Sequence, residues 1–198
     1  MSVASKRIVI VTGIPGVGKT TVLNKAADIA RQEYTVEIVN YGSVMFDAAV
    51  NSGFVENRDQ MRLLPPEKQR EIQKNAAEII AKKAAQGKLL IVDTHMLIAT
   101  PEGYLAGLPE WVITTLKPDV IVLVEAEPEF IFSRRSKDET RTRDQDSTIE
   151  INTHQNLCRA AATAISVLTG ATVKIVKNKE GMVDETAEEL AVVLKGVN

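Results

Sequence analysis

The sequence predicts an α/β fold built on a doubly wound parallel sheet of five strands, with helices on both faces. Five short apolar runs, most of them rich in Val and Ile, alternate along the chain with stretches whose apolar residues recur at helical spacing. Continuous apolar runs of this kind are typical of strands that are buried on both faces of a parallel sheet. The predicted strands are Ile8–Val11, Val36–Asn40, Leu89–Asp93, Val120–Val124 and Thr172–Val176.

Helical stripes lie between or after these strands and complete the alternation. They are formed by Leu23, Ala26, Ala27 and Ala30, by Ile72, Ala76, Ile79 and Ile80 within residues 66–86, by Leu157, Ala161, Ala164, Ile165 and Leu168, and by Ala187, Leu190, Ala191 and Leu194. Pro128 is well placed to begin a further helix, whereas Thr100–Tyr104 and Gly107–Pro109 contain many turn-forming residues and predict a long loop. Because no repeat or linker interrupts the pattern, we expect one domain over residues 1–198.

The composition excludes several kinds of protein. A chain of 198 residues with 44% hydrophobic and 25% charged residues can form one globular domain, and its formal net charge of −2 provides no general attraction to nucleic acid. The single cysteine, Cys158, excludes an internal disulfide and a cysteine-based zinc site, and its Ala-rich surroundings indicate a small core residue. We recognise neither a signal peptide nor an apolar stretch long enough to cross a bilayer, and we expect a cytoplasmic protein without a membrane partner.

The strongest functional signal follows the first strand. The octet GIPGVGKT, residues 13–20, fits the phosphate-binding loop pattern G-x-x-x-x-G-K-[ST] between a strand and a helix, as in the P-loop NTPase fold. Its glycines allow successive N–H groups to face an anion, and the following helix adds the positive end of its dipole. Lys19 can then reach the β- and γ-phosphates of ATP, and the Thr20 hydroxyl can ligate Mg²⁺. The residues predicted to bind the ATP phosphates are Gly13, Ile14, Pro15, Gly16, Val17, Gly18, Lys19, Thr20 and Thr21.

Two arginines follow the second strand, beyond a helical segment. Ligands of such sheets bind at the carboxyl ends of the strands, so residues in this place are candidates for a second site. Arg58 and Arg62 are four residues apart, so that on a helix their guanidinium groups would share a face and could hold a second phosphate. The alternative is a solvent-exposed face on which they pair with Asp59 and Glu56.

The third strand ends in Asp93. An aspartate in this position is the usual partner of Mg²⁺ in phosphate-loop proteins, here through water, and the alternative is a turn residue at the strand end. His95 follows two residues later. It can contact a ligand, but a polar structural residue at the strand end is the simpler interpretation.

The segment after the fourth strand alternates basic and acidic residues, RRSKDETRTRDQD over residues 134–146, with almost no apolar anchor. Taken alone, such a segment indicates a solvated charged loop. Downstream of a phosphate loop it is better explained as a mobile lid whose arginines close over the triphosphate.

Together these residues resemble the archaeal-type adenylate kinase family, a branch of the nucleoside monophosphate kinases, over nearly the whole chain. The resemblance rests on TGIPGVGKTT (12–21), NYGSVMFDAA (40–49), NRDQMRLL (57–64), VDTHMLIATPEGYLAGLP (92–109) and RRSKDETRTRD (134–144). It implies a reversible, Mg²⁺-dependent transfer of a phosphoryl group from ATP to AMP that gives two ADP, and it implies a homotrimer. It also implies an AMP-binding helical insertion at about residues 41–85 and a short lid at about residues 134–147.

Carried over by position, the resemblance assigns Lys19 and the lid residues Arg134, Arg141 and Arg143 to catalysis. The AMP side would comprise Tyr41, Gly42, Arg58, Arg62 and His95. More familiar bacterial relatives carry an arginine in the helix after the second strand, whereas GSVMFDAA (42–49) has none, and Arg58 and Arg62 are the candidate substitutes. Some of those relatives also have a longer lid with a cysteine zinc site, which this sequence lacks.

Two other functions stay open from the residues alone. The sequence offers no evident Ser/His/Asp set or carboxylate pair, which agrees with transfer to an acceptor that is already a phosphate. A nucleotide-dependent switch or assembly ATPase would need a Gln or Glu that positions water, and we identify none. A kinase for GMP, CMP, UMP or another small acceptor is not distinguished, because adenine contacts in such pockets are often made by backbone atoms.

Overall fold

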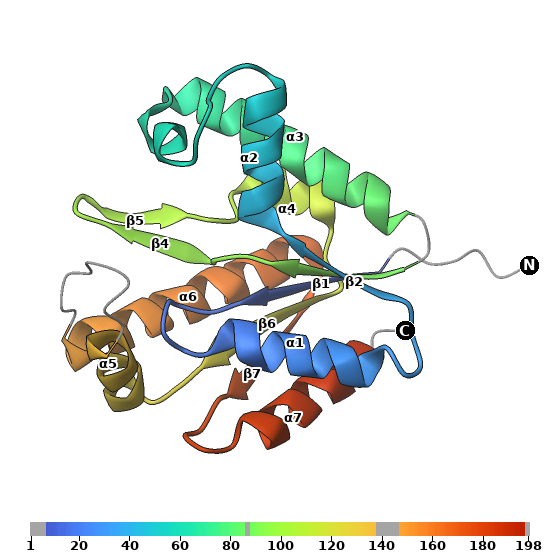
Figure 1. Cartoon of the computed structure of the whole chain (residues 1–198), viewed down its shortest axis with the longest axis vertical. Helices are drawn as coiled ribbons and strands as arrows, with labels where there is room; N and C mark the ends of the chain where they lie inside the picture. Colours follow the sequence, from blue (N-terminus) through green and yellow to red (C-terminus); the bar gives the residue numbers. More distant parts are fainter. Residues whose placement is uncertain (1–6, 86–87, 138–146, 197–198) are drawn as a thin grey trace, which may run out of the picture.

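The computed structural model describes residues 7–85, 88–137 and 147–196. In this part of the chain five parallel strands form one sheet in the order β2-β3-β1-β6-β7 (Figure 1). The strands are β1 (Arg7–Thr12), β2 (Val36–Asn40), β3 (Leu89–Asp93), β6 (Val120–Glu125) and β7 (Thr172–Lys177). All five predicted strands are therefore confirmed, and the central three bury almost every side chain, as their continuous apolar runs require.

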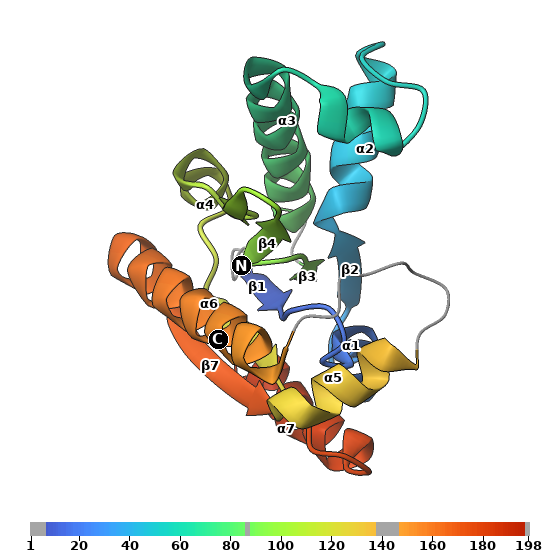
Figure 2. The ribbon, with the colours of Figure 1, turned by 90° about the vertical axis from the view of Figure 1, so that its left-hand side faces the viewer.

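Helices cover both faces of the sheet, which confirms the doubly wound α/β fold (Figures 1 and 2). Helices α1 (Lys19–Ala30) and α7 (Val183–Lys195) pack against each other on one face. The other face is covered by α3 (Pro66–Ala84), α4 (Glu110–Leu116) and α6 (Thr148–Thr169). The connection from β1 runs to β2, on one side of β1, whereas the connection from β3 runs to β6, on its other side. This change of direction opens the crevice in which such sheets bind ligands.

Helix α6 differs from its sequence pattern in the face that it buries. The stripe from Leu157 to Leu168 is helical as predicted, but Leu157 is 38% and Leu168 69% exposed. Of the predicted stripe Ile165 is buried, and the other buried residues of the helix are Ile151, His154, Gln155, Cys158 and Ala162. An Ala-rich helix is weakly apolar all round, so its pattern does not single out one face. Cys158 is buried as expected, and burial raises the pKa of its thiol to about 11.

The loop predicted around residues 100–109 is wrong in one respect. Strands β4 (Leu97–Thr100) and β5 (Gly103–Ala106) form a short antiparallel hairpin there. The predicted turn lies at its tip, where Gly103 adopts a φ of 133°. The hairpin packs on α6 through Tyr104, whose ring lies 4.9 Å from that of His154. Its strands are four residues each and partly exposed, which is too little for a recognisable strand pattern.

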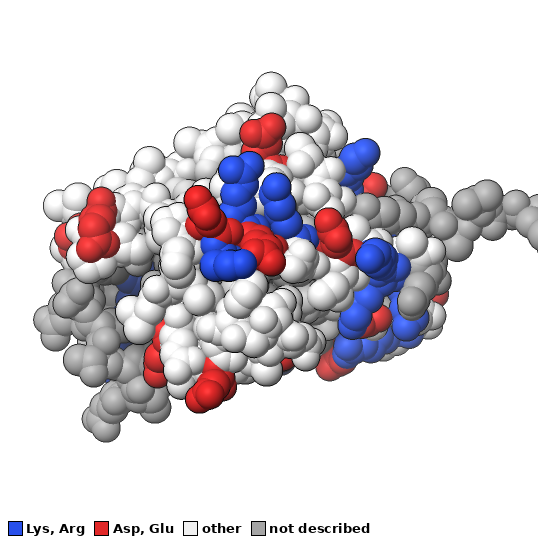
Figure 3. All heavy atoms as spheres, turned by 90° about the horizontal axis from the view of Figure 1, so that it is seen from above, with Lys and Arg blue, Asp and Glu red and all other residues white. Residues whose placement is uncertain are grey.

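The segment between β2 and β3 forms a helical insertion that projects from the sheet (Figures 1 and 2). It consists of α2 (Tyr41–Asn51), the 3₁₀ helix η1 (Asp59–Leu63) and α3. Residues of this insertion form an apolar cluster separate from the main core, with Ala48, Ala49, Val55 and Ile72 at its centre. Figure 3 views the molecule from this side and shows Lys and Arg interspersed with Asp and Glu. Lys83 of α3 forms an ion pair with Glu37 of β2 at 3.0 Å. Within the described ranges, no helix has the length and apolar character needed to span a membrane.

Candidate active site

The predicted phosphate loop connects β1 to α1 and leaves the N-terminus of that helix open to a ligand. Gly18 is the residue before α1, with a φ of 84° that favours glycine, and it provides no side chain to cap the first N–H groups. The loop backbone lies so close to β6 at Gly13 that there is no room for a side chain, because a Cβ there would lie 2.6 Å from the carbonyl oxygen of Val124. Thr20 and Thr21 are exposed in the first turn of α1. The loop therefore presents uncapped backbone donors in the arrangement that binds phosphate.

The outer carbonyl oxygens of the loop are contacted by side chains from three other segments. His95 Nδ1, beyond β3, lies 3.1 Å from the carbonyl oxygen of Gly13. Arg135 Nε, on helix α5 (Pro128–Ser136), donates to the carbonyl oxygen of Pro15 at 2.9 Å. The carbonyl oxygen of Val17 accepts from Arg134 Nη1 at 3.3 Å and from Asn178 Nδ2 at 2.7 Å. Residues far apart in the sequence thus meet at the carbonyl oxygens of the loop.

Lys19 and Asp93 form an ion pair where β1 and β3 lie side by side. Both side chains are mostly buried, and Asp93 Oδ2 also accepts from Asn40 Nδ2 at 3.0 Å. Asn40 and Asp93 are register partners in β2 and β3, which explains why their side chains meet. Burial lowers the pKa of Lys19 to about 8, whereas the neighbouring carboxylate works in the opposite direction and favours the charged ammonium.

The first turn of α2 lies next to this pair and is reached by Arg58. Asn40 caps α2 through its Oδ1, which accepts from the Ser43 N–H at 3.0 Å. Arg58 Nη2 donates to Ser43 Oγ at 2.9 Å, and its guanidinium lies 5.3 Å from the ring centre of Phe46. A helix N-terminus and an exposed guanidinium together form a second place where an anion can bind.

Three further residues predicted for the AMP side, Tyr41, Gly42 and Arg62, lie in surroundings unlike those of Arg58. Tyr41 is buried, and its hydroxyl donates to the carbonyl oxygen of Gln73 at 2.8 Å; burial raises the pKa of this hydroxyl. Gly42 lies in the first turn of α2, where a Cβ would meet only Asn40 Oδ1 at 3.4 Å. The side chain of Arg62 is outside the described structure, but its backbone is in the 3₁₀ helix η1 and not in an α-helix. The α-helix that would place Arg58 and Arg62 on one face is therefore not formed at these residues, because on a 3₁₀ helix residues three apart, and not four apart, are aligned.

Known proteins show a consistent similarity to this chain. Residues 12–152 match the model of a protein family described as an AAA domain. The adenylate kinase of Methanocaldococcus jannaschii is 52% identical over 190 residues, which are 96% of this chain and 98% of that protein. The adenylate kinase of Methanothermobacter thermautotrophicus is 51% identical, over 96% of this chain and all of its own. The chain belongs to the archaeal adenylate kinase family.

Solved structures support the fold of this adenylate kinase family member. A shikimate kinase from Bacteroides thetaiotaomicron aligns with a TM-score of 0.54 at 13% identity, over 96% of this chain and 98% of its own. A sugar kinase from Janibacter aligns with a TM-score of 0.53 at 17% identity, over 98% of this chain and 96% of its own.

Several contacts at the candidate site of this family member were not predicted from the sequence. Arg135 and Asn178 contact the phosphate loop, and Asn40 and Ser43 connect Asp93 to Arg58. Asn40 and Asn178 each stand at the carboxyl end of a predicted strand, so the rule that located Asp93 would also have found them. Nothing in the local sequence distinguishes Arg135 from Arg134. The predicted lid residues Arg141 and Arg143 lie outside the described residues.

Proposed function

We infer that this chain is an adenylate kinase, which transfers a phosphoryl group reversibly between ATP and AMP to give two ADP. Family membership at about half identity over nearly the full chain is the observation that carries this conclusion. The site agrees with it, because two places that can bind phosphate lie on either side of Asp93. The phosphate loop and Lys19 are on one side, and the first turn of α2 with Arg58 is on the other.

In the proposed mechanism, residues 13–21 bind the phosphates of ATP with backbone N–H groups, and the Lys19 ammonium holds the β- and γ-phosphates. The oxygen atoms of Thr20 and Asp93 are the ligand types that Mg²⁺ prefers, and Asp93 would act through water. Both residues lie beside Lys19, so the donor set fits a metal ion carried by the nucleotide. Bound Mg²⁺ would neutralise charge between the β- and γ-phosphates.

AMP binds on the side of the insertion in this proposal. Arg58, beside the N-terminus of α2, would hold its phosphate, with Arg62 and Gly42 as further candidates. Tyr41 and His95 would belong to the AMP side without holding the phosphate, because their side chains contact the carbonyl oxygens of Gln73 and Gly13. The acceptor oxygen of AMP is already anionic, so no general base is required. The enzyme then contributes alignment of the two phosphates and exclusion of water, which would otherwise accept the phosphoryl group.

The remaining features of the proposal concern the whole chain. Residues 1–198 form one domain with an AMP-binding insertion at about 41–85 and a lid at about 134–147, in which Arg134, Arg141 and Arg143 would stabilise the transferred group. We place the protein in the cytoplasm, with nucleotides as its partners rather than nucleic acid or membrane. A homotrimer follows from the family resemblance. The exposed Leu157, Val167 and Leu168 of α6 support self-association, without indicating the number of subunits.

A panel of acceptor nucleotides tests the proposed reaction. Purified protein with Mg-ATP should form ADP rapidly when AMP is added, and slowly with GMP, CMP, UMP or no acceptor. ADP formation that does not depend on AMP would indicate a switch or assembly ATPase. Faster turnover with another acceptor would indicate a kinase of different specificity. Omitting Mg²⁺ should abolish transfer in the same assay.

A further inference from the structure

Asn178 packs directly against the backbone of the phosphate loop. It directly follows β7 and is only 1% exposed. Its Nδ2 donates to the carbonyl oxygen of Val17 at 2.7 Å, the shortest of the four described contacts with loop carbonyls. A Cβ on Gly18 would lie 2.5 Å from this nitrogen, so the asparagine fits directly against the loop backbone.

The hydrogen bond that Nδ2 donates to Val17 determines the orientation of the Asn178 amide. The Oδ1 atom is buried and has no hydrogen-bond partner among the described residues. If the amide were turned over, Oδ1 would face the carbonyl oxygen of Val17, and two acceptors would be in contact. The hydrogen bond to Val17 is therefore the interaction that requires an amide here.

Holding the carbonyl of Val17 also orients the next N–H group. The peptide that joins Val17 to Gly18 is trans, so its C=O and N–H point in opposite directions. A carbonyl directed at Asn178 consequently turns the Gly18 N–H toward the opposite side of the loop, away from β7. Because a glycine follows this carbonyl, the peptide has more rotational freedom than most, and an external partner is needed to fix it.

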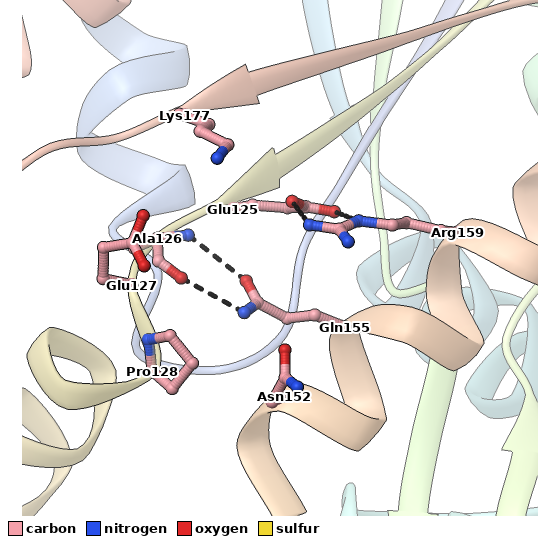
Figure 4. A pocket seen from close by; sticks show the side chains of 8 residues that line it. All are labelled: Glu125, Ala126, Glu127, Pro128, Asn152, Gln155, Arg159 and Lys177. Atoms are coloured by element: carbon pink, nitrogen blue, oxygen red, sulfur yellow. Dashed lines mark hydrogen bonds and ion pairs between the residues drawn. The ribbon is translucent and has the colours of Figure 1, made fainter. Parts of the chain in front are cut away.

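Asn178 is itself held from the neighbouring strand. Its backbone N–H donates to the carbonyl oxygen of Glu125 at 2.7 Å, one residue beyond the paired part of β7. Figure 4 shows how α6 anchors this end of β6: Arg159 binds both carboxylate oxygens of Glu125, at 2.7 and 2.5 Å, while Gln155 bonds to the N–H and C=O of Ala126, at 3.2 and 3.1 Å. The asparagine therefore projects from a fixed support and not from a free loop.

We propose that Asn178 is a positioning residue of the ATP site, which fixes the peptide between Val17 and Gly18 so that the Gly18 N–H faces the bound phosphate. It acts through the loop and does not touch the reacting atoms. The proposal rests on the proposed binding of ATP at this loop, which turnover and ATP binding by the unaltered protein test independently of any variant.

Two variants separate the hydrogen bond from the packing. Asn178→Ala removes the donor and should raise KM for ATP by about 3- to 10-fold, the effect of one lost hydrogen bond. Asn178→Asp keeps the shape but places an acceptor against Val17, and should raise KM for ATP more than alanine does at pH 8. Lowering the pH should reduce the defect of the aspartate variant, since a protonated carboxyl can again donate. KM for AMP should stay unchanged in both, and Asn152→Asp, on the exposed side of α6, is the matched control.

Binding of inorganic tripolyphosphate provides the decisive comparison, because this ligand has phosphates and no base. Calorimetry should show that the alanine variant loses affinity for tripolyphosphate and for ATP by the same factor, while its affinity for AMP is retained. A loss for ATP without a loss for tripolyphosphate would overturn the proposal and assign Asn178 to the base. Equal losses for ATP and AMP, or an alanine variant weaker than the aspartate variant at pH 8, would indicate a packing role and would also overturn it.

Discussion

The phosphate loop and the helical insertion across from it are built in contrasting ways. The loop offers backbone groups, and side chains from the ends of β3 and β7 and from α5 hold its carbonyls. The insertion has its own apolar cluster and reaches the site through the long side chain of Arg58. A binding site formed by backbone groups whose carbonyls are hydrogen-bonded on several sides cannot change its shape easily. A site formed by a long side chain on a separate apolar cluster can. The comparison suggests a fixed ATP side and an adjustable AMP side, and the following experiments test it.

Removing the ammonium of Lys19 should have the largest effect. Lys19→Ala is expected to lower kcat by about 10³-fold, because the variant loses the mostly buried ammonium that we propose to hold the β- and γ-phosphates. Steady-state kinetics give the rate, and thermal unfolding should show an intact fold. Lys25→Ala, which removes an exposed lysine of α1 paired with Asp184, is the control and should turn over normally. Near-normal turnover of Lys19→Ala would mean that the ATP side does not depend on this residue.

Truncating Arg58 should affect the other side of the site. Arg58→Ala is expected to raise KM for AMP by about 10- to 100-fold, as for a lost hydrogen bond between charged groups. KM for ATP should change little, and Arg62→Ala is expected to behave in the same way. Arg70→Ala removes an arginine of the same insertion that lies over Trp111, at 4.4 Å, and serves as the control. Equal changes in both KM values would contradict the division into an ATP side and an AMP side.

A pH profile should give the smallest and most selective change. Burial lowers the pKa of Lys19 to about 8 in the free protein. Bound phosphate favours the charged form, so ATP affinity is retained below this pH and lost as the pH rises through it. KM for ATP should be constant up to about pH 7 and then rise by at most about tenfold per pH unit. KM for AMP, measured in the same samples, should not follow this curve. A flat KM for ATP up to pH 9.5 would show that Lys19 stays charged.

Sequence patterns within short segments were sufficient to predict the five strands, the phosphate loop and Asp93. The five strands and the phosphate loop follow from short apolar runs and from the spacing of Gly13, Gly18 and Lys19. Asp93 was located because it ends a strand. The strand-end rule also indicates Asn178 as a site candidate, but its partner, Val17, and the partner of Arg135, Pro15, lie more than a hundred residues away in the sequence, so the contacts themselves could not be predicted.

Other differences arise from weak patterns. Helix α6 is Ala-rich, so packing against the sheet and not periodicity decides that Ile151 is buried and Leu168 exposed. The β4–β5 hairpin is too short for a recognisable strand pattern. The spacing of Arg58 and Arg62 predicted an α-helical face, but Asp59–Leu63 is a 3₁₀ helix.

The central place of β1 also has a consequence for synthesis. Of the five strands of the sheet this one is made first, but its two neighbours, β3 and β6, come much later in the chain. Its apolar residues therefore have no partner strand until β3 (Leu89–Asp93) has been made, and they lack their second partner until β6 (Val120–Glu125) follows. Pairings of such long sequence separation form slowly and leave apolar segments open to aggregation. The phosphate loop, although encoded near the start, is expected to acquire its final shape only after β7 and Asn178 have emerged.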